Sequence, residues 1–188
     1  MIGVILAGGR SSRMGTDKAA YAVAGRPMIE WVAEALESVC DRIVVAGREE
    51  LAGWETLADP GRPHRGPLAG LVAALHALPG RHLAVVSVDQ PWVRSETLRR
   101  LGEMAGGLAA VPVDEGVRQT TCAVYPPGLV DQAEAELAGG GSLQSLLDVT
   151  SFQPVVDWRR FGEDGRSWFS VDTPRAAEEG LARFGLPG

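Results

Sequence analysis

Residues 1–18 read MIGVILAGGRSSRMGTDK. A compact run of apolar, mostly β-branched residues stops at Gly8-Gly9, which is typical of a buried parallel strand that ends in a tight turn. Three cations then follow against a single Asp17, so this stretch carries a net charge of +2 in a chain of formal net charge −6. The cations are Arg10, Arg13 and Lys18. Glycines allow backbone N–H groups to approach an anion, and each charge-assisted hydrogen bond adds roughly 1.5–3 kcal/mol. The stretch therefore predicts a polyphosphate-binding turn; the alternative is an ordinary strand-to-helix turn with exposed cations.

The composition is that of a globular domain of ordinary size. The chain has 188 residues, of which 45% are hydrophobic and 22% charged, so we expect a single domain over residues 1–188. The first apolar run is too short for a membrane span, and a sequence pI near 5.1 argues against a nucleic-acid partner. Cys40 and Cys122 form no CxxC pair and share no ligand spacing with the histidines. We therefore expect buried free thiols, no zinc site and a cytoplasmic location.

Strand and helix patterns alternate along the chain. The patterns predict strands over 3–7, 43–46, 83–88, 108–113, 121–125 and 169–171. Apolar residues at helical spacing predict helices that begin near Pro27, Leu68, Ser95, Gly128, Ser142 and Thr173. Such alternation implies right-handed βαβ units, and hence an α/β fold with three layers, α/β/α, around a mostly parallel, Rossmann-like sheet. In sheets of this kind, ligands bind beyond the carboxyl ends of the strands.

Two carboxylates are candidates for holding a divalent metal beside a bound polyphosphate. Asp89 directly follows the strand predicted at 83–88, and Asp172 follows the strand predicted at 169–171. Magnesium is usually held by one or two carboxylates together with substrate phosphates and water. Each residue also has a plain structural alternative: Asp89 as a turn residue and Asp172 as a helix N-cap.

The signature of residues 6–18 resembles that of one family of nucleotidyltransferases. LAGGRSSRMGTDK is similar to the L-A-G-G-x-S-x-R-M-G-x-D-K of the molybdenum cofactor guanylyltransferases. Four further stretches resemble that family in the expected order: GRPM at 25–28, GPLAG at 66–70, VDQP at 88–91 and FSVDTP at 169–174. The resemblance spans nearly the whole chain and implies transfer of GMP from GTP to molybdopterin, with Mg²⁺ as cofactor and release of pyrophosphate.

The resemblance also assigns roles to individual residues. The implied catalytic residues are Lys18 on the transferring phosphate, Arg13 on the β and γ phosphates, and Asp89 on magnesium. The implied nucleotide-binding residues are Leu6, Ala7, Gly8, Gly9, Lys18, Asp59 and Asp89, of which Asp59 would read the guanine edge. The implied metal ligands are Asp89 and, as a second carboxylate, Asp172. Transient contact with the proteins that insert molybdenum and mature molybdoenzymes is implied as well, whereas a membrane or nucleic-acid partner is not.

The chain departs from the family pattern at three places. Ala46 stands where an Asn is common, Gln119-Thr120-Thr121 stands where a Pro is usual, and Asp172 replaces an Asn. Asp172-Thr173-Pro174 resembles the D-T-P of the related cytidylyltransferases, so a CTP-using enzyme is the main alternative. Gly9 and the GPLAG stretch favour guanine. A sugar-phosphate nucleotidyltransferase is a further alternative, which the short chain disfavours. A non-catalytic nucleotide-binding module is another, which is disfavoured because the chain has both Lys18 and Asp89 and a mere binder needs neither.

Overall fold

The structure, a computed structural model, describes residues 1–8, 17–61 and 66–188. Its main sheet has the strand order β10-β7-β9-β6-β1-β4-β5, with β8 paired to β7, and a separate hairpin joins β2 to β3. The strands are β1 Ile2–Leu6, β2 Ala22–Val23, β3 Arg26–Pro27, β4 Arg42–Ala46, β5 Thr56–Leu57, β6 Leu83–Ser87, β7 Ala109–Asp114, β8 Val117–Arg118, β9 Cys122–Tyr125 and β10 Phe152–Val155.

Parallel pairing surrounds the first strand. β1 lies between β4 and β6 and is parallel to both, with Leu6 level with Ala46 on one side and with Ser87 on the other. β5 and β10 add parallel pairs at the two edges, whereas β9 runs antiparallel between β6 and β7. The carboxyl ends of β6, β1 and β4 therefore share one edge of the sheet, as predicted.

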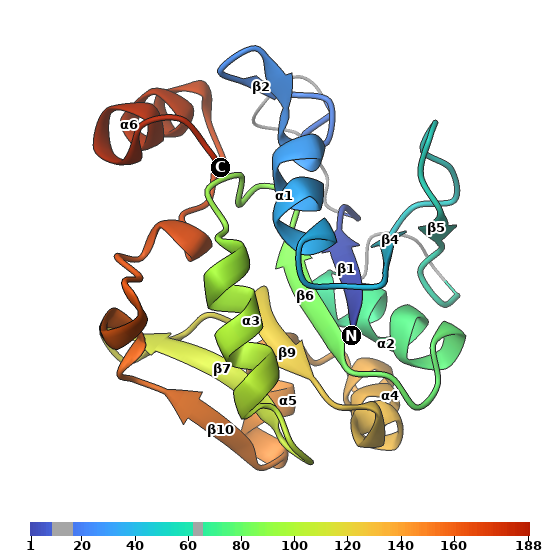
Figure 1. The fold of residues 1–188 in the computed structure, drawn as a ribbon. Coiled ribbons are helices and arrows are strands. Elements are labelled where there is room, and N and C mark those ends of the chain that lie inside the picture. The colour runs from blue at the N-terminus through green and yellow to red at the C-terminus, as the bar shows by residue number, and fades with distance from the viewer. Residues whose placement is uncertain (9–16, 62–65) are drawn as a thin grey trace.

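Helices cover both faces of the sheet, which confirms the three-layer α/β/α expectation. In Figure 1, α1 and α3 lie in front of the sheet, while α2, α4 and α5 lie behind it. The α-helices are α1 Met28–Glu37, α2 Pro67–Ala77, α3 Ser95–Met104, α4 Val130–Ala138, α5 Leu143–Val149 and α6 Pro174–Phe184. Three short 3₁₀ helices are η1 Pro127–Leu129, η2 Trp158–Phe161 and η3 Arg166–Trp168.

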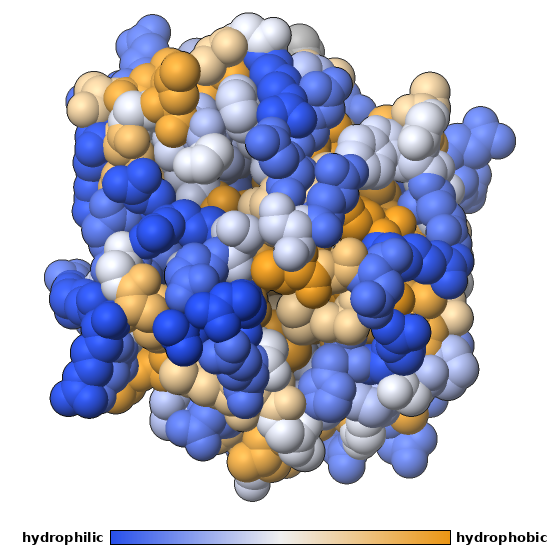
Figure 2. All heavy atoms as spheres, in the orientation of Figure 1, coloured by the Kyte–Doolittle hydropathy of each residue, from blue (hydrophilic) through white to orange (hydrophobic). Residues whose placement is uncertain are grey.

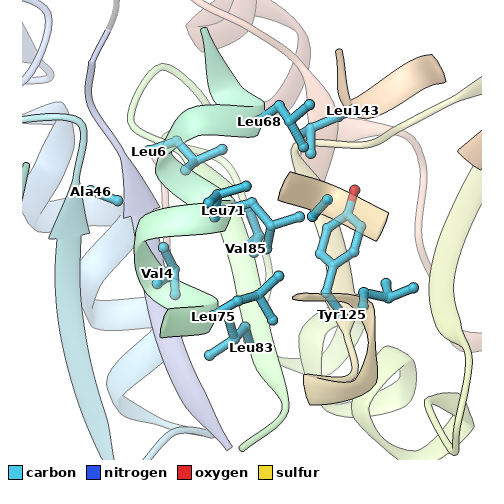
Figure 3. Close-up of a cluster of buried hydrophobic side chains, with 14 of the residues drawn as sticks. Val4, Leu6, Ala46, Leu68, Leu71, Leu75, Leu83, Val85, Tyr125 and Leu143 are labelled. Carbon is cyan, nitrogen blue, oxygen red and sulfur yellow. The ribbon is translucent and has the colours of Figure 1, made fainter. Parts of the chain in front are cut away.

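Alternating side chains of the strands form two cores. Val4 and Leu6 of β1 join the cluster beneath α2, α4 and α5, whereas Ile5 packs with α1 and α3 on the opposite face. Figure 3 shows Val4 and Leu6 beside Leu71 and Leu75 of α2. This alternation fixes the register of β1, because a slip by one residue would exchange the two faces.

The C-terminal helix packs against the end of the molecule that carries the strand-end turns. Trp92 is 1% exposed, stacks edge-on against Phe169, and donates a hydrogen bond from Nε1 to the Gly185 carbonyl at 2.9 Å. Gly180 of α6 is required here, because a Cβ at this position would lie 2.3 Å from the Trp92 ring. Trp92 is thus a packing residue that attaches α6 to the turn after β6.

Several expectations from the sequence need correction. Residues 169–171 form no strand: Phe169 has an extended backbone, and the Val171 N–H donates to the Asp89 carbonyl at 2.7 Å, but no ladder forms. Ser95 does not cap α3, because the N-cap is Arg94 and no side chain caps it. Ser142 and Thr173 do cap their helices, through Ser145 N–H and Ala176 N–H respectively.

Figure 2 shows hydrophilic residues over most of the face seen in Figure 1, with hydrophobic residues visible between them. Within the described ranges, no helix is both long enough and apolar enough to cross a bilayer. Both cysteines are free thiols; Cys122 is buried as expected, but Cys40 is only half-buried.

Candidate active site

A pocket opens where β1, β4 and β6 end. Its walls come from the turns that follow these three strands and from the N-terminus of α2. The lining residues are Leu6, Ala7, Gly8, Lys18, Ala46, Gly47, Asp59, Gly66, Pro67, Gly70, Ser87, Val88 and Asp89. Six residues that the sequence assigned to nucleotide binding therefore line one pocket: Leu6, Ala7, Gly8, Lys18, Asp59 and Asp89. The other two assigned residues in the first turn, Gly9 and Arg13, lie outside the described residues.

One lysine joins the two carboxylates that the sequence proposed as metal ligands. Lys18 Nζ donates to Asp89 Oδ2 at 2.7 Å and to Asp172 Oδ1 at 2.5 Å. Asp89 is held on the sheet side of the site, with its side chain 15% exposed, whereas that of Asp172 is 55% exposed. Burial of Lys18 disfavours its charge, but the hydrogen bonds to Asp172 and Asp89 outweigh that effect and raise its pKa above the usual value. Lys18 is therefore a protonated cation at neutral pH.

The donor set suits a magnesium ion that is shared with a substrate. Asp89 and Asp172 both reach the same ammonium group, so their carboxylates lie close enough to serve one cation. The described residues contain no cluster of three or more His, Cys, Asp or Glu side chains able to hold a metal by themselves. Magnesium commonly takes one or two carboxylates and completes its shell with phosphates and water. The residues present fit such an ion, which would depend on the substrate for its remaining ligands.

Two glycines bring the turns after β1 and β4 into contact. Gly47 has φ +93°, and a Cβ at this position would lie 2.5 Å from Gly8 Cα and 2.7 Å from Gly8 N. Only glycine tolerates both this conformation and this approach to the backbone. The same Cβ would lie 3.5 Å from Asp59 Oδ1, which places the Asp59 carboxylate beside Gly47.

The N-terminus of α2 closes another side of the pocket. Gly66 is the N-cap with φ 81°, and Pro67 follows at the first helical position. Gly70 lies against the strand ends, because a Cβ there would approach Leu6 Cδ2 to 2.8 Å. The glycines of the GPLAG stretch thus allow the helix start and its close packing, and they direct the positive end of the helix dipole to the pocket, where it favours an anion.

The stretch at 119–121 that departs from the family pattern lies next to the pocket edge. The Ser87 N–H donates to the Thr121 carbonyl at 2.9 Å and to Gln90 Oε1 at 3.1 Å. Gln90 in turn donates from Nε2 to Thr121 Oγ1 at 3.2 Å. Two polar side chains, those of Gln90 and Thr121, therefore lie with the Ser87 backbone between the turn after β6 and the start of β9.

Sequence reasoning missed two residues of the turn after β4. Gly47 lines the pocket, and Arg48 beside it donates from Nε to the Ala7 carbonyl at 3.0 Å and from Nη1 to Asp17 Oδ2 at 2.5 Å. The available signal was the position of Gly47-Arg48 at a strand's carboxyl end, where ligand-binding residues concentrate. Ala46 lines the same pocket and is fully buried, so no side-chain polar group occupies the place where the family has an Asn.

Comparisons with known proteins identify the family of the chain. The family model described as "MobA-like NTP transferase domain" matches residues 3–155. A probable molybdenum cofactor guanylyltransferase from Natronomonas pharaonis is 36% identical, with 97% of each chain covered. A probable molybdenum cofactor guanylyltransferase from Deinococcus radiodurans is 40% identical, with 72% of each chain covered.

Solved structures extend the likeness to the fold. The crystal structure of molybdopterin-guanine dinucleotide biosynthesis protein A from Archaeoglobus fulgidus superposes with a TM-score of 0.81 at 26% identity, covering 96% of each chain. A 2-C-methyl-D-erythritol 4-phosphate cytidylyltransferase from Thermus thermophilus, at 19% identity and a TM-score of 0.69, shares the fold alone. The relatives' names are those of nucleotidyltransferase enzymes, and this chain belongs to the family of MobA-like NTP transferase domains.

Proposed function

We propose that the protein transfers GMP from GTP to molybdopterin, that it releases pyrophosphate, and that it requires Mg²⁺. The observation that carries the proposal is the 2.7 Å contact between Lys18 and Asp89 in the strand-end pocket. A cation for a phosphate and a carboxylate for a metal thus lie where one bound triphosphate can reach both. The names of the relatives supply the substrates: they are molybdenum cofactor guanylyltransferases.

The pocket offers a suitable place for the donor nucleotide. We assign backbone contacts to Leu6, Ala7 and Gly8, all of which line the pocket. Asp59 lines it as well, and its carboxylate can accept hydrogen bonds from the N1–H and N2–H₂ donors of guanine. Cytosine offers no such pair of donors on adjacent positions, so Asp59 favours GTP over CTP. The assignment of Gly9 and Arg13 to the nucleotide remains a prediction from the sequence.

The reaction needs positioning and charge neutralisation, and no protein nucleophile. An oxygen of the acceptor's phosphate forms a bond to the α-phosphorus of GTP, and the bond between that phosphorus and the bridging oxygen breaks. The leaving pyrophosphate carries away the electron pair. Lys18 Nζ, protonated at neutral pH, would offset the charge that develops on the transferring phosphate. Asp89 and Asp172 would hold magnesium, which supplies Lewis-acid stabilisation of the phosphate oxygens when bound.

Contact of Lys18 with both carboxylates implies a rearrangement when the substrates bind. In the structure, Lys18 neutralises Asp89 and Asp172 at 2.7 and 2.5 Å. Asp89 and Asp172 would have another cation as partner if they held magnesium, and the Lys18 ammonium group would then be available to the phosphate. Asp172 directly precedes Thr173, the N-cap of α6. The start of the helix therefore fixes the Asp172 backbone, while the Asp172 side chain is exposed and can turn.

A cytidylyltransferase is the second candidate, favoured by Asp172 before Thr173-Pro174. An assay that supplies molybdopterin with GTP, CTP, ATP or UTP and measures pyrophosphate and dinucleotide product separates the two candidates. We expect product with GTP and magnesium, and at most a trace with the other nucleotides. Product with CTP alone would overturn the guanine assignment, and no product with any nucleotide would overturn the transferase proposal.

Two variants test the role of the metal carboxylate. Asp89→Asn removes a charge from the pocket, whereas Asp157→Asn removes one from an exposed position that pairs with Arg160. We expect the first variant to lose magnesium-dependent pyrophosphate release and the second to retain it, with both folded. Unchanged turnover in Asp89→Asn would remove Asp89 from the mechanism.

The wider assignments are part of the same proposal. We propose one nucleotidyltransferase domain over residues 1–188, supported by a family match and a structural superposition that together cover most of the chain. Transient contacts with the proteins that supply and receive the cofactor, and a cytoplasmic location, follow from the proposed activity.

A further inference from the structure

We infer that Arg48 is a positioning residue, whose guanidinium forms a clamp between Ala7 and Asp17 and thereby holds Lys18 in place for phosphoryl transfer. This inference rests on the proposed function, because the step in which Lys18 acts is the proposed reaction. It concerns a residue that neither the sequence signature nor the comparisons single out.

The clamp consists of three hydrogen bonds from one side chain. Arg48 Nε donates to the Ala7 carbonyl at 3.0 Å. Its two terminal nitrogens donate to the two oxygens of Asp17, with Nη1 to Oδ2 at 2.5 Å and Nη2 to Oδ1. The planar guanidinium therefore uses its fork on a carboxylate in bidentate geometry and its remaining edge on the backbone.

The two partners of Arg48 lie in sequence between β1 and Lys18. Ala7 is the residue after the strand and lines the pocket, and Asp17 immediately precedes Lys18. Asp17 continues the link, because its Oδ1 also accepts from the Ala19 N–H at 3.0 Å. Its backbone carbonyl accepts from the N–H groups of Ala20 and Tyr21. Fixing Asp17 thus fixes the start of the segment from which the Lys18 side chain reaches Asp89.

Arg48 itself is held by the contact between two turns. It follows Gly47, whose backbone touches Gly8 closely enough that no side chain fits between them. The side chain of Arg48 is 20% exposed and that of Asp17 38% exposed, so the pair is partly shielded from water. Hydrogen bonding to Arg48 also holds the pKa of Asp17 below its usual value. The charges are therefore paired within the site, although each residue belongs to a different strand–helix connection.

The chain contains a matched control for this pair. Arg42, at the start of the same strand β4, makes a bidentate pair with Glu55, with Nε to Oε2 at 2.9 Å and Nη2 to Oε1. That pair has the same chemistry but lies at the opposite end of the strand, away from the pocket. Replacing Arg42 measures what the loss of such a pair does without any effect on the site.

The test compares Arg48→Ala, Arg48→Lys, Asp17→Asn, the double variant Arg48→Ala/Asp17→Asn and Arg42→Ala. We measure kcat with GTP and molybdopterin, the dissociation constant of GTP with magnesium, and amide exchange by NMR. Displacement of a reacting group by about 1 Å can cost a rate factor of roughly 100, so we expect kcat to fall by about 10- to 100-fold in Arg48→Ala. The nucleotide affinity should change far less, and Arg42→Ala should keep the kcat of the original chain.

The variants at the clamp should behave as one unit. We expect Asp17→Asn to resemble Arg48→Ala, and the double variant to lose little more than either single variant. Arg48→Lys keeps the charge but not the fork, so it should recover only part of the rate. A normal kcat in Asp17→Asn together with a low kcat in Arg48→Ala would mean that Arg48 acts on the substrate directly. That result would refute the inference that Arg48 acts by holding Asp17.

Amide exchange separates failure of the clamp from failure of the proposed function. In Arg48→Ala we expect at least about tenfold faster exchange at Ala19, Ala20 and Tyr21, with no change in Arg42→Ala. Unchanged exchange would overturn the clamp whatever the activity, and faster exchange with an unchanged kcat would overturn its positioning role. If the original chain makes no product at all, the proposed function fails, while the exchange data still decide whether the clamp exists.

Discussion

Replacement of Gly47 by alanine tests the contact that shapes the pocket. Gly47 combines φ +93° with a backbone approach in which the new Cβ would lie 2.5 Å from Gly8 Cα and 2.7 Å from Gly8 N. Both neighbours are backbone atoms, so no flexible side chain can move aside. The turns after β1 and β4 would have to separate to make room.

The expected loss of stability has two parts. A side chain at positive φ costs about 1–2 kcal/mol, and overpacking costs about 1–3 kcal/mol more. Together they predict that Gly47→Ala lowers the free energy of unfolding by about 2–5 kcal/mol, which is a large share of the roughly 5–15 kcal/mol typical of a domain.

A second glycine isolates the steric part. Gly53 has φ +83°, close to that of Gly47, but a Cβ there would meet nothing within 4 Å. Gly53→Ala should therefore show only the conformational cost of about 1–2 kcal/mol. Urea unfolding followed by circular dichroism gives both free energies, and with a slope of about 2 kcal/mol per M the two midpoints should differ by about 0.5–1.5 M. Equal midpoints would show that the turns do not touch as described, and the account of the pocket would need revision.

Three further predictions concern other parts of the chain. Gly180→Ala should destabilise the protein by about 1–3 kcal/mol, because the new Cβ would lie 2.3 Å from the Trp92 ring. Alanine normally favours a helix over glycine by about 1 kcal/mol, so a higher urea midpoint would contradict this packing. Hydrogen bonding to Arg48 lowers the pKa of Asp17, so the ionised carboxylate stabilises the folded protein at pH 7. The loss of unfolding free energy caused by Asp17→Asn should therefore be seen at pH 7 and should vanish as the pH falls below the usual pKa of 3.8. An equal loss of unfolding free energy at pH 7 and pH 3 would refute that linkage. Burial raises the pKa of Cys40 to about 11, so at pH 8 iodoacetamide should alkylate Cys40 roughly a hundredfold more slowly than an unperturbed thiol. Equal alkylation rates, measured by mass spectrometry, would contradict this shielding of the thiol.

The regular elements of the fold were predictable because they have strong local signals. Continuous apolar runs predicted β1, β4 and β6, and side-chain caps predicted the starts of α5 at Ser142 and of α6 at Thr173. The two-residue strand β5 has no periodicity to detect. The edge strand β10 contains Pro154 and exposes two of its four residues, so its pattern does not differ from that of a loop.

The site was predictable in part because parallel strands bring their carboxyl ends together. That rule predicted that Asp89 lies near the stretch that contains Lys18. In the structure the Lys18 side chain contacts Asp89, which is 71 residues away in sequence. The same rule applies to Arg48, which follows β4, but by itself it does not separate Arg48 from an ordinary surface arginine after a strand. Its partners, 31 and 41 residues away, become neighbours only through the contact between Gly47 and Gly8.

The most direct test of the central claim is a crystal structure with a non-hydrolysable GTP analogue and Mn²⁺, whose anomalous signal locates the ion. We predict that the triphosphate lies in the pocket between Gly8 and Gly66, with Lys18 Nζ on a phosphate oxygen and the anomalous peak on the Asp89 carboxylate. A nucleotide bound elsewhere, or an ion with no contact to Asp89, would contradict the account.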